Sequence, residues 1–297
     1  TLTLSNPSSG TNISTSSTQT VISNDDAEFS ISASSANKTE GNTGDNPYTF
    51  TVTRSGFTNQ SNTVDYKLTG TGINPVDTAD FSSIDSLGTN SGLPSGTVSF
   101  DPGETSKTIT INVSGDSILE SDEDFNVTLS NPSSGTIINT ASAAGQIDND
   151  DAEIVLATTT TTVTEVDSGA DSTHTYTVNR SGETNQQSTV TWTVTGSNGF
   201  DVDTSNGDLS SVVANTTVVN STGTLSFASG ETTKTLSVNV KGDDNVESNE
   251  DFTITLSDPT SGTSLGSTVS GSGTVTDDDT RFEFSADVSQ AEGNGTD

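Results

Sequence analysis

The chain has 297 residues and a formal net charge of -33, because 41 aspartates and glutamates stand against 8 lysines and arginines. Proteins bind nucleic acids and anionic membranes through basic patches, so this negative charge argues against both as partners. Cations are the favoured partners instead. Cysteine is absent, which excludes disulfides and a thiol nucleophile, and no run approaches the roughly 18 apolar residues of a membrane helix.

The pattern of apolar residues indicates short β-strands. Only 27% of the residues are hydrophobic, a value that in a highly charged chain is typical of disorder. Here, however, valine, isoleucine, threonine and aromatic residues alternate with polar ones in short runs, as they do in half-buried strands. We therefore expect a folded, all-β protein.

The sequence repeats itself. "TLTLSNPSSGT" begins at residue 1, "NVTLSNPSSGT" at 126 and "TITLSDPTSGT" at 253, so the offsets are 125 and 127 residues. We interpret the chain as part of a tandem array of repeats. Its expected parts are the C-terminal part of a preceding repeat at 1–26, complete repeats at 27–151 and 152–279, and the N-terminal part of a following repeat at 280–297.

Seven strands are predicted in the first complete repeat. In chain order they are 28–33, 48–53, 62–69, 96–100, 107–113, 124–129 and 143–147. Short alternating strands at this density, with turn signals between them, are typical of a two-sheet antiparallel sandwich. We therefore predict tandem seven-stranded antiparallel immunoglobulin-like β-sandwiches, arranged as a rod.

Period-two alternation assigns one face of each strand to the core. The expected core is Phe29, Ile31, Tyr48, Phe50, Val52, Val64, Tyr66, Leu68, Val98, Phe100, Ile109, Ile111, Val113, Phe125, Val127 and Leu129, with Tyr176, Val178, Val190, Trp192, Val194, Leu225, Phe227, Leu236, Val238, Val240, Phe252, Ile254 and Leu256 in the second repeat. Trp192 stands in the place of Tyr66, and we interpret it as core filler.

His174, the single histidine, stands in the place of Tyr48. We interpret it as a strand residue rather than a catalytic base, and we expect no enzyme activity.

Two stretches gather carboxylates without a nearby base. "GDSILESDEDF" at 115–125 and "GDDNVESNEDF" at 242–252 each contain five, and a glutamate near the first strand and an Asp/Asn cluster after the seventh recur with them. In a sandwich, the loop before strand six and the end of strand seven can meet at one tip. Two like charges about 5 Å apart repel by roughly 3 kcal/mol at an effective dielectric of 20, so such a cluster requires a counter-ion. Oxygen ligands favour calcium over magnesium, which demands a tighter octahedron.

"TVSFDPGETSKTITINV", "GDSILESDEDFNVTLSNPSSGT" and "IDNDDA" together resemble the Calx-beta domain, the calcium-binding sandwich of sodium/calcium exchangers and of many large secreted bacterial proteins. The resemblance covers essentially the whole chain and implies metals at one tip of each sandwich. The ligands that it implies are Glu40, Asp80, Asp116, the backbone carbonyl of Ile118, Glu120, Glu123, Asp150 and Asp151 in the first repeat, and Glu165, Asp243, Glu247, Glu250, Asp278 and Asp279 in the second, with Asp208 or Asp203 as the counterpart of Asp80.

The sequence also departs from the family pattern. The segments 70–95 and 196–223 are longer than the usual connection between the third and fourth strands, which leaves the assignments of Asp80 and Asp208 open. Asn149 stands where the family often has aspartate, and Asn245 replaces Ile118, so we expect the two repeats to differ in ion count.

The leading functional hypothesis is a structural segment of a large extracellular bacterial surface protein, such as an adhesin stalk, a fibril or a sheath, that calcium rigidifies. The repeats follow one another without a Gly/Ser spacer in "IDNDDAEIVL", and Asp150 and Asp151 lie in that junction. Calcium ions and neighbouring repeats of the same chain are the expected partners. Self-association into fibrils is a further expectation, with a longer polypeptide running through any such fibril.

Two rival hypotheses stay open. One is a calcium-dependent carbohydrate- or protein-binding module that grips cell-surface polysaccharide or a partner through the long loops 70–95 and 196–223. The other is a regulatory calcium sensor, as in exchangers, which the lack of a membrane span in this segment disfavours. The threonine run 158–162 suggests an ice- or carbohydrate-binding face, but the preference of threonine for strands is the simpler account.

Overall fold

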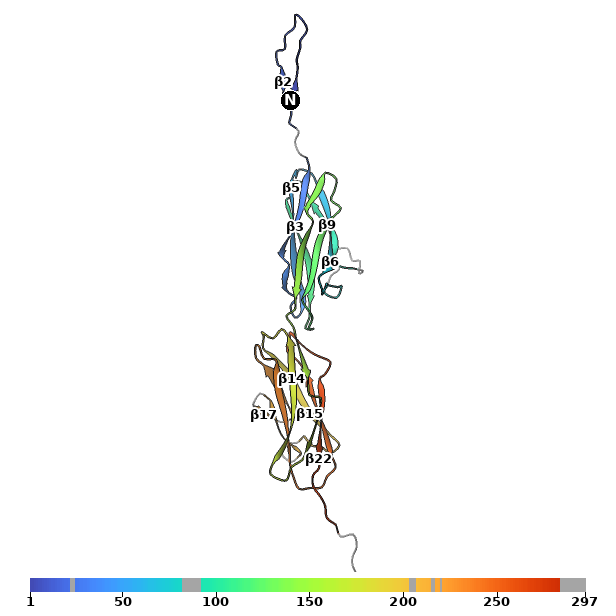
Figure 1. Cartoon of the computed structure of the whole chain (residues 1–297), viewed down its shortest axis with the longest axis vertical. Helices are drawn as coiled ribbons and strands as arrows, with labels where there is room; N and C mark the ends of the chain where they lie inside the picture. Colours follow the sequence, from blue (N-terminus) through green and yellow to red (C-terminus); the bar gives the residue numbers. More distant parts are fainter. Residues whose placement is uncertain (22–24, 82–91, 203–206, 215–216, 220, 284–297) are drawn as a thin grey trace, which may run out of the picture. The chain divides into compact units, whose positions relative to one another are not determined.

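The computed structural model describes residues 1–21, 25–81, 92–202, 207–214, 217–219 and 221–283. Every regular secondary-structure element in these residues is a β-strand, as Figure 1 shows. The described residues contain no helix that is long and apolar enough to cross a membrane. The chain divides into two compact units. Unit 1 contains Thr1–Gly115 and Ser121–Asp148, and unit 2 contains Asp116–Glu120 and Asn149–Asp297.

Unit 1 is built around two sheets. A four-stranded sheet has the order β10-β3-β5-β8 and a five-stranded sheet has the order β4-β11-β9-β6-β7. Their strands are β3 (Ala27–Ser35), β4 (Asn37–Thr39), β5 (Gly44–Gly56), β6 (Asn62–Thr71), β7 (Ser95–Phe100), β8 (Ser106–Gly115), β9 (Glu123–Ser130), β10 (Thr136–Thr140) and β11 (Ser142–Asp148). A separate antiparallel pair, β1 (Leu2–Thr3) and β2 (Ser17–Thr18), precedes them.

Unit 2 repeats the plan and adds to it. A six-stranded sheet has the order β17-β16-β19-β14-β12-β21, and a five-stranded sheet has the order β13-β22-β20-β15-β18. The strands are β12 (Ala152–Leu156), β13 (Thr160–Thr164), β14 (Asp171–Gly182), β15 (Ser188–Ser197), β16 (Leu209–Ala214), β17 (Thr217–Val219), β18 (Thr222–Phe227), β19 (Thr233–Lys241), β20 (Glu250–Ser257), β21 (Thr263–Leu265) and β22 (Ser270–Thr276).

The prediction of an all-β sandwich is confirmed, and each of the seven strands expected in the first repeat is present. Two details of the prediction were wrong. The repeat has two further strands, β4 and β10, and these pair in parallel with β11 and β3, so the sheets are not purely antiparallel. Two changes of sheet account for these pairs: the chain leaves β3 for β4 at Ala36, and it leaves β10 for β11 at Ala141.

The cores follow the predicted alternation. Every expected core residue is buried except Tyr66, which is half-buried, whereas its counterpart Trp192 is fully buried. His174 is also fully buried, with its ring edge-to-face against Phe252 at 4.9 Å between centroids. The core of unit 2 is extended by the long connection after β15, because Leu209 and Val212 of β16 point into it.

A buried arginine anchors the loops at one end of each sandwich, a feature that the sequence pattern does not predict. Arg54 is 2% exposed, and its guanidinium lies over the Phe100 ring. It donates hydrogen bonds to the carbonyl oxygens of Thr58, Gln60, Asp101 and Glu104 and to Asn62 Oδ1. Arg180, 3% exposed, is bonded in the same way in unit 2, so each buried arginine finds acceptors for its N–H groups in the surrounding loops.

Candidate metal centre

The parallel pairing of β4 with β11 determines where Glu40 lies. Thr39 is in register with Asp148, and the next residue, Glu40, donates its main-chain N–H to the Asp148 carbonyl at 3.3 Å. Glu40 therefore lies beside the chain that leaves β11, which is the segment 149–151. The Glu40 side chain is 4% exposed, so its carboxylate has lost most of its water.

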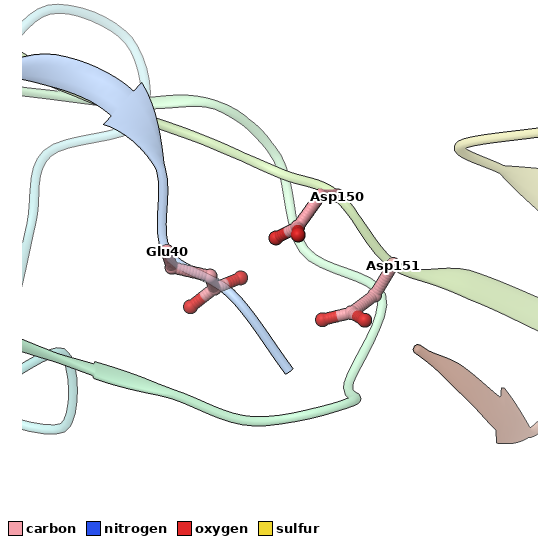
Figure 2. A group of neighbouring side chains, drawn as sticks. All are labelled: Glu40, Asp150 and Asp151. Carbon is pink, nitrogen blue, oxygen red and sulfur yellow. The ribbon is translucent and has the colours of Figure 1, made fainter. Parts of the chain in front are cut away.

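Three carboxylates meet at this point in the first repeat. One carboxylate oxygen from each of Glu40, Asp150 and Asp151 lies within 4.8 Å of the other two, and Figure 2 shows the three groups turned toward a common space. Asp151 is fully buried. Mutually repelling carboxylates in such surroundings are stabilised by a cation that shares their oxygens.

The second repeat uses the same placement. Strand β13 pairs in parallel with β22, and Glu165 donates its main-chain N–H to the Thr276 carbonyl at 2.9 Å. Its carboxylate accepts a hydrogen bond from the N–H of Asp243 at 3.2 Å. Burial nevertheless raises the pKa of Glu165 to about 7, and the charges of Asp243, Glu247 and Asp277 add to the shift.

Further carboxylates surround Glu165. The pKa of Glu250 is raised to about 7. Burial is the largest cause, and the charges of Asp208, Glu247, Glu165 and Asp243 add to it. The pKa of Glu247 is raised as well, by burial and then by neighbouring aspartates. In each case burial is the largest cause of the raised pKa and the neighbouring carboxylates add to it, so these buried acids gather negative charge at one place.

Asp279 gives a separate sign that the second repeat suits a cation. Among the described residues, its Oδ2 atom is buried without a hydrogen-bond partner. Burial and the charges of Asp277, Asp278, Asp244 and Asp167 raise the pKa of Asp279. A buried carboxylate oxygen without a donor is costly, and an oxygen-seeking cation satisfies it. The residues present therefore fit a divalent ion.

The acidic loop is tied to the segment after the last strand in the same way in both repeats. In the first, Asp116 Oδ1 accepts a hydrogen bond from the N–H of Ile118 at 2.7 Å, and Asn149 Oδ1 accepts one from Glu120 at 3.1 Å. In the second, Asp243 Oδ1 accepts from Asn245 at 2.7 Å and Asp277 Oδ1 accepts from Glu247 at 3.2 Å. Asn149 and Asp277 are thus equivalent residues that shape the site, and neither was among the predicted ligands.

Asp80 and Asp208 occupy equivalent positions. The Asp80 carbonyl accepts a hydrogen bond from Ser114, and the Asp208 carbonyl accepts one from Lys241, each at 2.8 Å. Ser114 and Lys241 are themselves counterparts near the ends of β8 and β19. Asp208 also acts on the pKa of Glu250, so it faces the second cluster. Asp203, the alternative counterpart, lies outside the described residues.

The remaining predicted ligands are only partly gathered. In the described part of the chain, the group of three within 4.8 Å contains Glu40, Asp150 and Asp151, without Asp116, Glu120 or Glu123. Glu123 begins β9, and Ile118 is 56% exposed. The ligand roles of all these residues stay predictions.

A comparison with protein families matches the Calx-beta domain twice, at residues 24–151 and 148–280. The chain belongs to the Calx-beta family. The two matches overlap at 148–151, so the aspartate-rich segment is shared by the end of one Calx-beta domain and the start of the next.

Solved structures of the same type resemble the chain at low identity. The apo-form Calx CBD1 domain is 22% identical, with 43% of this chain and 99% of that chain covered and a TM-score of 0.34. CBD12 from CALX1.2 is 18% identical, and the calcium binding domain CBD12 of CALX1.1 is 16% identical; each comparison covers 83% of this chain and 99% of the other, with a TM-score of 0.35. A search of curated proteins finds no match.

Proposed function

We propose that each Calx-beta repeat binds calcium at its carboxylate cluster, and that calcium stiffens a tandem array that forms a structural part of an extracellular bacterial surface protein. The observation that carries the proposal is the recurrence of one arrangement. In both repeats a glutamate that follows a short parallel edge strand donates its main-chain N–H to the last strand, next to the aspartate-rich segment.

The chemistry of the side chains supports calcium. The candidate ligands are carboxylate and amide oxygens, cysteine is absent, and the single histidine is buried against Phe252 in the core. Calcium takes six to eight oxygen ligands in irregular geometry, whereas zinc prefers nitrogen and sulfur ligands. Extracellular calcium modules bind with dissociation constants of about 0.1 to 1 mM, which suits a protein bathed in calcium outside the cell.

The connection between the repeats supports the mechanical part of the proposal. Strand β11 ends at Asp148 and β12 begins at Ala152, so three residues connect them. Two of the three, Asp150 and Asp151, belong to the carboxylate cluster with Glu40. An ion held by these side chains restricts the backbone of the connection, and this restriction is how we expect calcium to stiffen the array.

Small-angle scattering of the chain in calcium and in EGTA tests the mechanical proposal. We expect a longer maximum dimension and a narrower distribution of distances in calcium. The double variant Asp150→Asn, Asp151→Asn is expected to give the EGTA profile in both buffers. Asp258→Asn, at an exposed position directly after β20 in unit 2, serves as its control. Identical profiles of the unmodified chain in the two buffers would contradict the proposal.

The rival role is a binding module that acts through 70–95 and 196–223. The structure of the second segment argues against this role. Part of it forms β16 and β17, which extend the six-stranded sheet, and Leu209 and Val212 are buried in the core. A structural function of β16 therefore accounts for its length. Calcium-dependent binding of the chain to polysaccharides on a glycan array, with loss of binding when 82–91 is replaced by a short turn, would instead support the rival.

A further inference from the structure

In each repeat one glycine lies so close to the segment that carries the candidate glutamate that a side chain on this glycine would not fit. A Cβ atom on Gly115, the last residue of β8, would lie 2.1 Å from the carbonyl oxygen of Gly41 and 2.8 Å from that of Glu40. A Cβ atom on the counterpart Gly242 would lie 1.8 Å from the carbonyl oxygen of Val166. In both repeats the obstacle is a backbone atom, which cannot turn aside as the end of a side chain can.

The requirement belongs to Gly115 and Gly242 rather than to their neighbours. The residue they approach is glycine in the first repeat, Gly41, and valine in the second, Val166. Neither Gly115 nor Gly242 has a positive φ, so the backbone conformation alone permits other residues there. Close approach of two main chains is the remaining reason for a glycine at this position.

The approach has a consequence for the carboxylate cluster. Gly242 is followed directly by Asp243, the first acid of the acidic loop, and the Asp243 N–H donates to the Glu165 carboxylate at 3.2 Å. A side chain on residue 242 would push the segment that carries Glu165 away from this loop. The same displacement in the first repeat would stretch the hydrogen bond from the Glu40 N–H to Asp148.

We propose that Gly115 and Gly242 are positioning residues for the metal centres: the absence of a side chain lets the segment that bears Glu40 or Glu165 lie against the start of the acidic loop. This inference rests on the proposed calcium function. In the first repeat a second residue holds the same segment, because Asn46 Nδ2 donates to the Glu40 carbonyl at 2.6 Å. In the second repeat Ser172 stands in the place of Asn46, and its buried hydroxyl has no hydrogen-bond partner among the described residues.

The test compares Gly115→Ala and Gly242→Ala with Thr108→Ala and Thr235→Ala, which remove exposed side chains from β8 and β19. Calcium titration followed by NMR of the whole chain reports each repeat separately. We expect each glycine variant to weaken calcium binding at least tenfold in its own repeat and to leave the other repeat unchanged. Amide exchange in EGTA supplies a metal-free measurement, in which Gly115→Ala is expected to speed exchange of the Glu40 N–H.

The outcomes separate this inference from the proposed function. If the unmodified chain binds calcium and both glycine variants bind it equally well, the positioning role is wrong while the calcium function stands. If the unmodified chain binds no calcium, the calcium function is wrong, and unchanged exchange of the Glu40 amide would also reject the positioning role. If Gly115→Ala does not fold, Gly242→Ala tests the same role in the other repeat, and calcium binding there that equals that of the unmodified chain overturns the proposal.

Discussion

The main-chain N–H of Glu165 lies 2.9 Å from the carbonyl oxygen of Thr276. This bond is the continuation of the parallel ladder between β13 and β22, and the bond from Glu40 to Asp148 continues the ladder between β4 and β11. A short edge strand thus delivers one carboxylate to the point where the aspartate-rich segment begins. The candidate metal centre is in this sense a product of strand register, and its properties can be tested by changing single side chains.

Removal of calcium should make the stability of the second repeat depend on pH. Burial raises the pKa of Glu165 in the folded chain to about 7, above its ordinary value of 4.5. A raised carboxyl pKa contributes stability that is complete below pH 4.5 and is lost as the pH rises through about 7. We expect urea unfolding in EGTA to show a loss of up to about 3 kcal/mol over this window.

The variant Glu165→Gln carries no charge at this position, so in EGTA it should lose less stability than the unmodified chain as the pH rises. In saturating calcium the variant should instead be less stable than the unmodified chain, because it lacks a candidate ligand. Equal pH dependence of the two proteins in EGTA would show that the raised pKa of Glu165 does not cause the pH dependence of stability.

His174 should give the second repeat a dependence on pH of the opposite sign. Its ring is fully buried, Thr161 Oγ1 lies 2.7 Å from Nδ1, and Nε2 is buried without a hydrogen-bond partner among the described residues. Burial lowers the pKa of His174 to about 4 from its ordinary 6.5. The folded state therefore resists protonation, and stability present above pH 6.5 is lost as the pH falls toward 4.

Replacement of His174 by phenylalanine should abolish this acid-induced loss at a cost of about 1 kcal/mol at neutral pH, since the bond to Thr161 is removed. The matched control is Tyr48→Phe at the equivalent position, which removes the bond from Tyr48 Oη to the Lys38 carbonyl but no titrating group near neutrality. Thermal unfolding at pH 4.5 and 7 measures both. An acid-induced loss that persists in His174→Phe would refute the assignment.

The buried arginines should be sensitive to removal. Arg54→Met leaves the buried Asn62 side chain and four partly buried loop carbonyl bonds without their donor, and a polar group left unpaired away from water costs about 1 to 3 kcal/mol. We therefore expect a loss of at least about 3 kcal/mol in the stability of the first repeat, measured by urea unfolding. Lys67→Met, at an exposed position on β6, is the control and should change stability by less than about 0.5 kcal/mol. A comparably small effect of Arg54→Met would contradict this role.

Much of the fold was predictable because it follows from local pattern. Alternation of apolar and polar residues is sufficient to assign residues such as Phe50 and Val127 to the core. The short strand β4, whose sequence is Asn-Lys-Thr, has no apolar residue that would reveal it. Its pairing with β11 depends on the change of sheet at Ala36, which is a tertiary feature.

The candidate metal centre was suggested by residue types alone, and its geometry was not predictable from the sequence. Recurrence of the acidic stretch indicated the candidate glutamates and aspartates. The equivalence of Asp80 and Asp208 emerges only from their common hydrogen bonds to β8 and β19, because the connections that carry them differ in length and sequence. Burial of Arg54 is likewise invisible in the sequence, since an arginine is ordinarily exposed unless the fold supplies acceptors for its five N–H groups.

Calorimetric titration of the unmodified chain with calcium tests the central claim most directly. We predict saturable binding of at least one ion in each repeat, with dissociation constants at or below about 1 mM and little competition from an equal concentration of magnesium. The titration should lose one class of site in Glu40→Gln and another in Glu165→Gln. Absence of any binding heat, together with an unfolding temperature that is the same in calcium and in EGTA, would contradict the account.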